Sequence, residues 1–395
     1  MQAQSVHDIC EVRLEGLLSE TVKSAQLREN SAFDEMAAPL DRNLVLFGAG
    51  QFGRRTLAGL RKVGLEPLAF ADNNSRIWGQ AIDGLPVLSP ADAAKRFGQS
   101  AAFVITIWNG HLPDRTSQRV AQLTALGCSK VVPFGFLYWK YPNTFLPFYP
   151  LDLPHKVLLE AESVMAVFRL WEDDRSRSEY VSQIGFRLLF DLDGLHSPEV
   201  GEHYFPPDVY RLASQEVLID CGAFDGDTIR SFVGRQGEEF ESIVAYEPDP
   251  LNWDSLQESV MALPERVRRK IVCFQQAVGA SHGTVAFDVT GTELSTAGAG
   301  KVLVESVALD ESLQGRTPTI VKFDVEGAEP DALSGAQQII RRDTPILAIS
   351  SYHLQNHLWR LPLSVSGMSD DYRYFLRPHS FEGWDLVCYA VPPGR

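Results

Sequence analysis

The chain has 395 residues, of which 45% are hydrophobic and 22% are charged, and its formal net charge is −15. At roughly 150 residues per domain, this length predicts two or three domains, each large enough to bury a core. The excess of acidic residues argues against nonspecific binding to nucleic acid or to anionic lipid. No apolar stretch approaches the roughly 18 residues of a membrane-spanning helix, so we expect neither a membrane span nor a signal peptide.

The five cysteines are an odd number and show no CxxC spacing. This pattern argues against a disulfide framework and against a zinc ribbon, and it fits a reducing compartment. We therefore expect a cytoplasmic protein.

Residues 1–42 predict a helical segment. Apolar residues between positions 7 and 38 recur at close to helical spacing, so we expect one amphipathic helix there. This helix either caps a neighbouring domain or forms the contact of a homodimer. The pattern is too short to sustain a coiled coil, which favours the cap.

Residues 43–140 predict a Rossmann-like, nucleotide-binding-like domain. Short apolar runs alternate with helix-forming stretches: the runs are 43–47, 68–71, 101–108 and 131–133, and the helical stretches include 54–63 and 91–97. Strands that alternate with helices at this spacing predict βαβ units and a parallel sheet.

A glycine-rich turn follows the first strand of this domain. Its sequence is Gly48-Ala-Gly50-Gln-Phe-Gly53, and Asp72 stands at the end of the next strand. Glycines in this pattern let the backbone approach a phosphate at a helix N-terminus, and the acid is placed to hold ribose hydroxyls. Three interpretations stay open: a nucleotide or nucleotide-sugar site, a turn of structural use only, and a working NAD(P) site.

The residues after Asp72 are not those usual in a dehydrogenase. They run Asp72-Asn-Asn, followed by Gly79 and by Gly84-x-Pro86. This pattern resembles the N-terminal nucleotide-binding-like domain of bacterial sugar acetyltransferases.

Residues 141–215 differ from the segments on either side. Four prolines open this stretch, and a long helix is expected from Lys156 to about Phe190 because its apolar residues repeat at intervals of three and four. We interpret the segment as a helical connector, and as a candidate lid, that packs against the following domain.

From residue 216 to the end, strands and helices alternate again. Five strands are expected at 217–219, 242–246, 271–275, 320–323 and 346–350, with an additional pair at 284–289 and 302–307 and a final hairpin at 372–376 and 385–391. Five parallel strands closed by an antiparallel hairpin describe a doubly wound α/β sheet with a reversed last strand.

The first two strands of this domain end in acids. Asp220-Cys-Gly-Ala-Phe-Asp-Gly-Asp-Thr follows the first, and Glu247-Pro ends the second. A carboxylate at the latter position accepts hydrogen bonds from both ribose hydroxyls. The pattern resembles the S-adenosylmethionine site of Rossmann-like methyltransferases, and a net-acidic site suits a cationic sulfonium. The predicted donor site comprises Asp220, Gly222, Ala223, Asp225, Gly226, Thr228, Glu247, Pro248 and Asn252.

Two later strands are also followed by residues that can bind ligands or transfer protons. These runs are Lys322-Phe-Asp-Val-Glu-Gly-Ala-Glu329 and Ser351-Tyr-His353. Ligands on open α/β sheets bind at the carboxyl ends of strands, so these residues should face the same crevice. With an ordinary pKa near 6.5, His353 can accept the proton of a hydroxyl acceptor at neutral pH. The alternative base is Asp324 or Glu326, either with a pKa raised by burial or holding a divalent cation.

We select His353 as the base, and Asp324 as the residue that orients either the acceptor or His353. No metal ligand is predicted, although such oxygen-rich sites suit Mg²⁺. Lys322 either extends its ammonium group toward solvent or pairs with a nearby acid, and it receives no catalytic role. The segment from Tyr204 to Asp208 either walls the donor site or packs in the core.

Together with the late runs Leu376-Arg-Pro-His379 and Val387-Cys-Tyr-Ala390, these motifs resemble, in order, the FkbM family of S-adenosylmethionine-dependent methyltransferases over about residues 203–392. The resemblance implies a Rossmann-like methyltransferase domain at 216–395. It also implies a transferase of carbohydrate biosynthesis that O-methylates a small molecule or glycan, such as a sugar or a related intermediate. Pro378 departs from the family, in which histidine often follows the arginine directly.

Two other functions stay open. The glycine-rich turn at Gly48 would serve an NAD(P)-dependent oxidoreductase. Alternatively, the protein is a non-catalytic binder of a nucleotide sugar.

Overall fold

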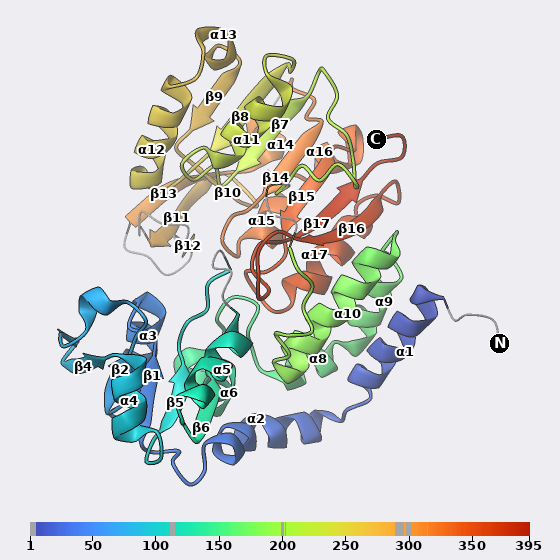
Figure 1. The fold of residues 1–395 in the computed structure, drawn as a ribbon. Helices are drawn as coiled ribbons and strands as arrows, with labels where there is room; N and C mark the ends of the chain where they lie inside the picture. The colour runs from blue at the N-terminus through green and yellow to red at the C-terminus, as the bar shows by residue number, and fades with distance from the viewer. Residues whose placement is uncertain are drawn as a thin grey trace. The chain divides into compact units, whose positions relative to one another are not determined.

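The computed structural model describes residues 5–110, 115–198, 201, 203–288, 296–297, 302–313 and 315–395. The chain divides into two compact units (Figure 1). Unit 1 comprises Met1–Val164, Ser178–Pro198 and Ser380–Trp384, and unit 2 comprises Met165–Arg177, Glu199–His379 and Asp385–Arg395. The segment 141–215, interpreted above as a connector, is thus divided between the two units.

The N-terminal segment forms two helices where one was expected, α1 (Val6–Leu18) and α2 (Val22–Ala37). The side chain of Thr21 accepts a hydrogen bond from the backbone N–H of Ser24, which caps the start of α2. A capping threonine satisfies a backbone donor that has no partner within the helix. This local interaction, which the apolar periodicity does not reveal, ends one helix and starts the next.

Unit 1 contains a six-stranded sheet with the order β3-β4-β2-β1-β5-β6. Its strands are β1 (Leu44–Phe47), β2 (Ala69–Ala71), β3 (Ala81–Ile82), β4 (Leu85–Leu88), β5 (Ala102–Ile105) and β6 (Lys130–Pro133). All pairings from β4 to β6 are parallel, as predicted, and β3 pairs with β4 in an antiparallel hairpin that was not predicted.

The helices of this part are α3 (Gln51–Lys62), α4 (Pro90–Phe97), α5 (Thr116–Ala125), α6 (Phe134–Lys140) and α7 (Pro142–Phe145), with a 3-10 turn at Ser75–Ile77. Helix α5 was not predicted.

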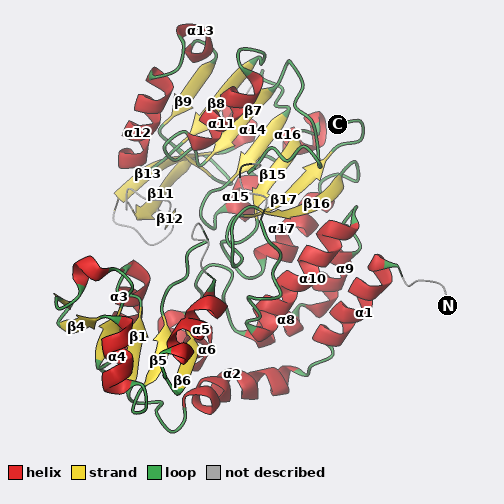
Figure 2. Cartoon of the chain, viewed as in Figure 1, coloured by secondary structure: helices red, strands yellow, loops and turns green. Residues whose placement is uncertain are grey.

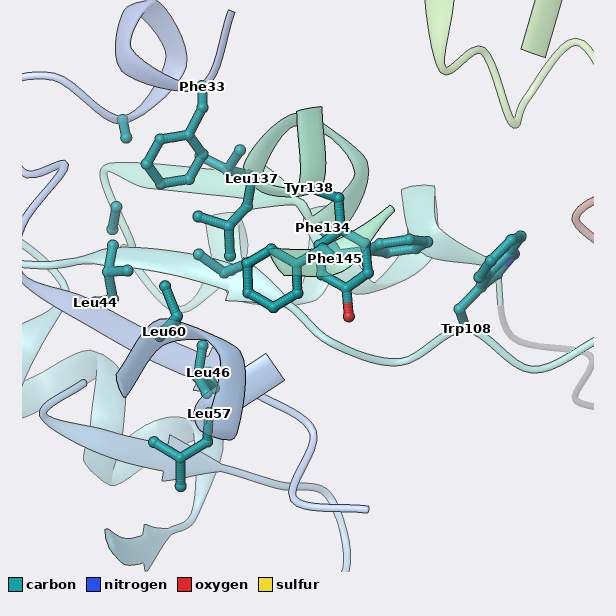
Figure 3. Packing of buried hydrophobic residues seen from close by; sticks show 14 of the residues in the cluster. Phe33, Leu44, Leu46, Leu57, Leu60, Trp108, Phe134, Leu137, Tyr138 and Phe145 are labelled. Carbon is teal, nitrogen blue, oxygen red and sulfur yellow. The ribbon is translucent and has the colours of Figure 1, made fainter. Parts of the chain in front are cut away.

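The β1 strand is buried on both faces. Leu44 and Leu46 belong to one apolar cluster, whereas Val45 and Phe47 belong to another. Successive side chains of a strand point to opposite faces, so a continuous apolar run is what a covered parallel strand requires. Figure 3 shows the first cluster, in which Leu44 and Leu46 lie near side chains of α3 and α6.

The long helix expected at 156–190 is three helices, α8 (Pro154–Leu159), α9 (Ala161–Phe168) and α10 (Asp174–Leu189). The carboxylate of Asp173 accepts a hydrogen bond of 2.7 Å from the backbone N–H of Ser176, which caps the start of α10. As at Thr21, a capping side chain divides a periodic apolar stretch.

Unit 2 contains a seven-stranded sheet with the order β16-β17-β15-β14-β7-β8-β9 (Figure 2). Its strands are β7 (Val217–Cys221), β8 (Ser242–Tyr246), β9 (Ile271–Phe274), β14 (Ile320–Phe323), β15 (Ile346–Ser350), β16 (Arg373–Pro378) and β17 (Leu386–Val391). Five strands are parallel, and β17 runs antiparallel to both β15 and β16. The α/β prediction with a reversed final hairpin is confirmed. The strand order reverses between β7 and β14, where open sheets bind ligands.

A second sheet in unit 2 has the order β10-β13-β11-β12. It comprises β10 (Ala277–Val278), β11 (Gly283–Asp288), β12 (Thr296–Ala297) and β13 (Val302–Val307). The predicted additional pair corresponds to β11 and β13, which are antiparallel, and position 289 of that prediction lies outside the described residues.

The helices of unit 2 after α10 are α11 (Asp227–Gln236), α12 (Pro250–Met261), α13 (Glu265–Arg268), α14 (Leu309–Ser312), α15 (Glu329–Ser334), α16 (Gln337–Asp343) and α17 (His357–Ser366). Within the described part of the chain, no helix combines the length and the apolar character needed to cross a membrane.

Candidate active site

The turn after β7 is held closely against the neighbouring strands. Gly222 has a φ of 82°, and a Cβ built there would lie 1.9 Å from the backbone oxygen of Asp324. The backbone N–H groups of Gly222 and Ala223 both donate to the carbonyl of Tyr246, each at 2.9 Å. Only glycine combines this backbone conformation with the absence of a side chain. The turn therefore requires Gly222 at this position.

Glu247 follows β8 and joins this strand end to the turn after β7. Its Oε2 accepts from the backbone N–H of Phe224 at 2.8 Å, and its Oε1 accepts from that of Asp249 at 2.9 Å. Burial raises the pKa of Glu247 to about 7, although these hydrogen bonds oppose the shift. Each carboxylate oxygen has a second lone pair, so the group can still accept hydrogen bonds from a ligand.

Lys322 lies on β14 directly beside Asp220 of β7. Its Nζ donates to Oδ1 of Asp220 at 2.9 Å and to the carbonyl of Gly222 at 2.6 Å. Burial alone would lower the pKa of Lys322, but the carboxylates of Asp220 and Asp324 raise it above its ordinary value. Burial raises the pKa of Asp220 to about 6 despite this cation. Lys322 thus links the carboxyl ends of β7 and β14, and pairing with a nearby acid is one of the two alternatives that the sequence left open for it.

The loops after β14 and β15 bring together Asp324, Glu326, Glu329 and His353, which we call the acid–histidine cluster. His353 Nδ1 lies 2.8 Å from Glu329 Oε1, and its Nε2 lies 3.4 Å from carboxylate oxygens of both Asp324 and Glu326. The side chains of His353 and Glu329 are 2% and 0% exposed, whereas those of Asp324 and Glu326 are 21% and 17% exposed. The latter two acids therefore form the accessible side of the cluster.

The protonation of His353 differs from the expectation of an ordinary pKa. Burial alone would lower the pKa of His353, but the carboxylates of Glu329 and Glu326 raise it well above 6.5. Burial opposes ionisation of Glu329, yet the charge of His353 holds the pKa of Glu329 below its usual range. The surrounding carboxylates therefore favour the protonated form of His353.

Tyr204 reaches the cluster from the segment that precedes β7. Its hydroxyl donates to Oδ2 of Asp324 at 2.7 Å, and Lys322 Nζ lies 5.0 Å from the centre of its ring. The backbone of Tyr204 has a φ of 64°, which is uncommon for a bulky residue and is typical of functional sites. The sequence left two alternatives for Tyr204, lining the donor site or packing in the core, and the structure shows a hydrogen bond from its hydroxyl to Asp324.

Among the described residues, Asp324, Glu329 and His353 form one group with metal-ligand atoms all within 4.8 Å of one another. Their donor types would suit a divalent cation. However, the Nδ1 to Oε1 distance of 2.8 Å is that of a hydrogen bond whose proton a cation would have to displace. We therefore interpret the group as an imidazolium–carboxylate pair.

The other predicted donor-site residues lie along the same strand ends. Gly226 is the N-cap of α11, and Thr228, in the first turn of that helix, is buried, as is Ala223. Pro248 is half-buried, and Asn252 is buried in the first turn of α12. Asp225 forms an ion pair of 2.8 Å with Arg230 near the surface.

The two late residues next to the departure at Pro378 have contacts of their own. Arg377 pairs with Asp173 at 2.6 Å and with Asp208 at 2.8 Å. His379 Nε2 lies 2.7 Å from the hydroxyl of Tyr389. These contacts hold β16 to its neighbours, and none of them involves the acid–histidine cluster.

The glycine-rich turn of unit 1 is also closely packed. A Cβ on Gly53 would lie 1.9 Å from the carbonyl oxygen of Gly48, and Gly50 is the N-cap of α3. The carboxylate of Asp72 accepts hydrogen bonds of 2.7 Å from the backbone N–H groups of Ala49 and Asn74. Asp72 therefore stabilises the turn itself, and a nucleotide site at Gly48, Gly50, Gly53 and Asp72 stays a prediction.

A doubly wound sheet with five parallel strands, a reversed final hairpin and acids at the strand ends beside its switch point is the fold of Rossmann-like methyltransferases. Residues 220–382 match the family model of the methyltransferase FkbM domain, so this part of the chain is a methyltransferase domain by class. The predicted resemblance is confirmed over this range.

The chain is similar along its whole length to the crystal structure of methyltransferase FkbM from Methylobacillus flagellatus KT. The two are 21% identical with a TM-score of 0.79, and the match covers 98% of this chain and 99% of that one. This likeness shows the fold, including a counterpart of unit 1. No curated protein sequence is significantly similar to the chain.

Two further solved structures match part of the chain. The precorrin-6y C5,15-methyltransferase of Geobacter metallireducens GS-15 is 12% identical over 46% of this chain and 82% of that one, with a TM-score of 0.30. A putative rRNA methylase of Clostridium thermocellum is 10% identical over 46% and 90%, with a TM-score of 0.29.

Proposed function

We propose that unit 2 transfers a methyl group from S-adenosyl-L-methionine to a hydroxyl group of a sugar, a glycan or a related biosynthetic intermediate. The observation that carries this proposal is the contact at the carboxyl ends of β7 and β14, where Lys322 links the strand-end acid Asp220 to the Gly222 turn. Glu247 stands at the adjacent strand end, as a ribose-binding acid would.

The residues present fit this donor. Among the described residues, none forms a hydrogen bond with Oδ2 of Asp220, although that oxygen is buried. A buried polar atom without a partner is typical of a site that a ligand completes. Glu247 would accept hydrogen bonds from the ribose, and the turn from Gly222 to Gly226 would hold the nucleoside and amino-acid parts. When bound, S-adenosylmethionine supplies an activated methyl group, whose bond to sulfur breaks as the bond to the acceptor oxygen forms.

Asp324 remains our choice for the residue that orients the acceptor, whereas the role of base, predicted for His353, is assigned to Glu326. The acceptor approaches the exposed side of the cluster, where Asp324, which Tyr204 holds in place, orients it. Alignment of the acceptor contributes much of the rate enhancement in such a displacement.

Glu326 takes the hydroxyl proton as the new bond forms, because burial raises the pKa of this carboxyl above its ordinary value. Its backbone φ of 52° is a further mark of a functional position. Protonated His353, 3.4 Å from both acids, holds their oxygens toward each other.

The test is binding of S-adenosylhomocysteine to the full chain by calorimetry, followed by methyl transfer to a panel of saccharides monitored by mass. We expect micromolar-range binding that Glu247→Gln and Asp220→Asn both abolish. The control is Glu265→Gln, an exposed acid of α13 in the same unit, which should leave affinity unchanged. Absence of binding to the wild-type chain would refute the proposal.

A further inference from the structure

Glu329 is the most buried acid of the acid–histidine cluster, and the proposed function gives it no part. Its side chain is 0% exposed, and Glu329 is the first residue of α15. Oε1 lies 2.8 Å from His353 Nδ1 and accepts from the backbone N–H of Val325 at 2.9 Å, whereas Oε2 lies 3.2 Å from His357 Nδ1. The carboxylate is therefore held from several directions.

This arrangement determines which nitrogen of His353 faces the accessible acids. Nδ1 is directed at Glu329, so Nε2 is the atom that lies 3.4 Å from both Asp324 and Glu326. A carboxylate on one imidazole nitrogen fixes the orientation of the ring and stabilises its charged form. Because the ring is 2% exposed, water cannot provide the same stabilisation.

We propose that Glu329 is a positioning residue: it fixes the ring of His353 and keeps that ring protonated, so that one charged N–H group serves Asp324 and Glu326 together. The inference rests on the proposed function and deepens it. In this proposal His353 is not a neutral base, as predicted from the sequence, but a charged residue that orders the two acids in contact with the acceptor.

The groups around His353 support this assignment. Glu329 is the nearest acid and the least exposed, so its interaction with the ring is the least screened. Asp324 and Glu326 are farther away and partly exposed. Lys322, 3.8 Å from Asp324, adds a positive charge that opposes protonation of the ring. Tyr352, with its ring centre 4.3 Å from that of His353, covers the ring without a charge at neutral pH.

His357, on the far side of Glu329, shares its carboxylate with His353. Glu329 therefore connects two buried imidazoles from α17 and the β15 loop. In Glu329→Gln, only the two more distant carboxylates, those of Asp324 and Glu326, would stabilise the charged ring of His353. Burial would still disfavour that charge, so the pKa of the ring would fall toward or below its ordinary value.

The experiment compares the full-length wild type with Glu329→Gln, which preserves shape, and Glu329→Asp, which preserves charge. Imidazole NMR titration reports the protonation of His353, and a His353→Asn spectrum assigns its signal. We expect the wild-type ring to stay protonated through neutral pH. In Glu329→Gln the ring should lose its proton as pH rises through a pKa lower by one unit or more, roughly a tenfold change in proton affinity.

The rate of methyl transfer supplies the second readout. In Glu329→Gln it should decline at least roughly tenfold on the alkaline side of the new pKa and recover on the acidic side. Glu329→Asp should restore most of the rate at neutral pH. Affinity for S-adenosylhomocysteine should stay within a factor of two in both variants, because Glu329 makes no contact with Asp220, Gly222 or Glu247 in the described structure.

The matched control is Glu29→Gln in unit 1. Glu29 is also a buried acid paired with a histidine, with Oε2 2.9 Å from Nδ1 of His155. Its replacement should change neither the pH profile nor the NMR signal of His353.

Three results would overturn the inference. One is a wild-type His353 that is neutral at pH 7, which NMR shows even if Glu329→Gln does not fold. Another is a Glu329→Gln enzyme that is faster at neutral pH, as a neutral histidine base would make it. The third is a rate that a chelator abolishes and Mg²⁺ or Mn²⁺ restores, because a cation would then occupy the place of the Nδ1 proton. If the wild type binds no donor and methylates nothing, the proposed function fails, whereas the NMR result on His353 still stands.

Discussion

Replacing Lys322 by methionine tests the link between β7 and β14. The Lys322 side chain is 3% exposed and that of Asp220 is 0% exposed, with 2.9 Å between Nζ and Oδ1. Removing one partner of such a buried pair destabilises a protein by about 3–5 kcal/mol, because it leaves an uncompensated charge. Here the loss should lie near the lower limit, since Asp220, with a pKa of about 6 even beside the cation, can take up a proton. The Gly222 carbonyl also loses its donor.

The assay is urea denaturation of wild type, Lys322→Met, Asp220→Asn and the double variant at pH 7. The double variant should be more stable than Lys322→Met by at least about 1 kcal/mol, because it no longer buries a carboxylate without its cation. Additive effects of the two substitutions would refute this explanation. So would a Lys322→Met variant as stable as wild type.

Three other substitutions test neighbouring parts of the site. The pKa of Glu247 is raised from 4.5 to about 7. Its contribution to the free energy of unfolding should therefore be full below pH 4.5 and should be lost as pH rises through 7. A pH series of denaturation curves should show that this pH dependence is smaller in Glu247→Gln than in the wild type. Gly222→Ala, with a φ of 82° and a Cβ 1.9 Å from a backbone oxygen, should destabilise the chain by at least about 2 kcal/mol in thermal unfolding; an unchanged midpoint would contradict the packing described for the turn. Tyr204→Phe removes a hydrogen bond to the Asp324 carboxylate worth about 1.5–3 kcal/mol, so turnover should decrease at least tenfold while calorimetry shows unchanged donor affinity.

Much of the fold could be predicted from local sequence. Strands such as β1, β7 and β15 are continuous apolar runs because both faces of a parallel sheet are covered. The antiparallel end of the larger sheet followed from two strands without a long helix between them. Conversely, the breaks at Thr21 and Asp173 were missed because a single capping side chain outweighs an apolar repeat that continues past it.

The site shows the same division. Gly222 and Glu247 could be assigned from their places at strand ends, since the sheet brings all parallel strand ends to one edge. That Lys322 pairs with Asp220, and that Tyr204 binds Asp324, depends on strand register and on loops more than 100 residues apart in the chain. The protonation of His353 was beyond the sequence for the same reason. A pKa is set by distances to charges and by exclusion of water, and only the tertiary structure places three carboxylates around that buried ring.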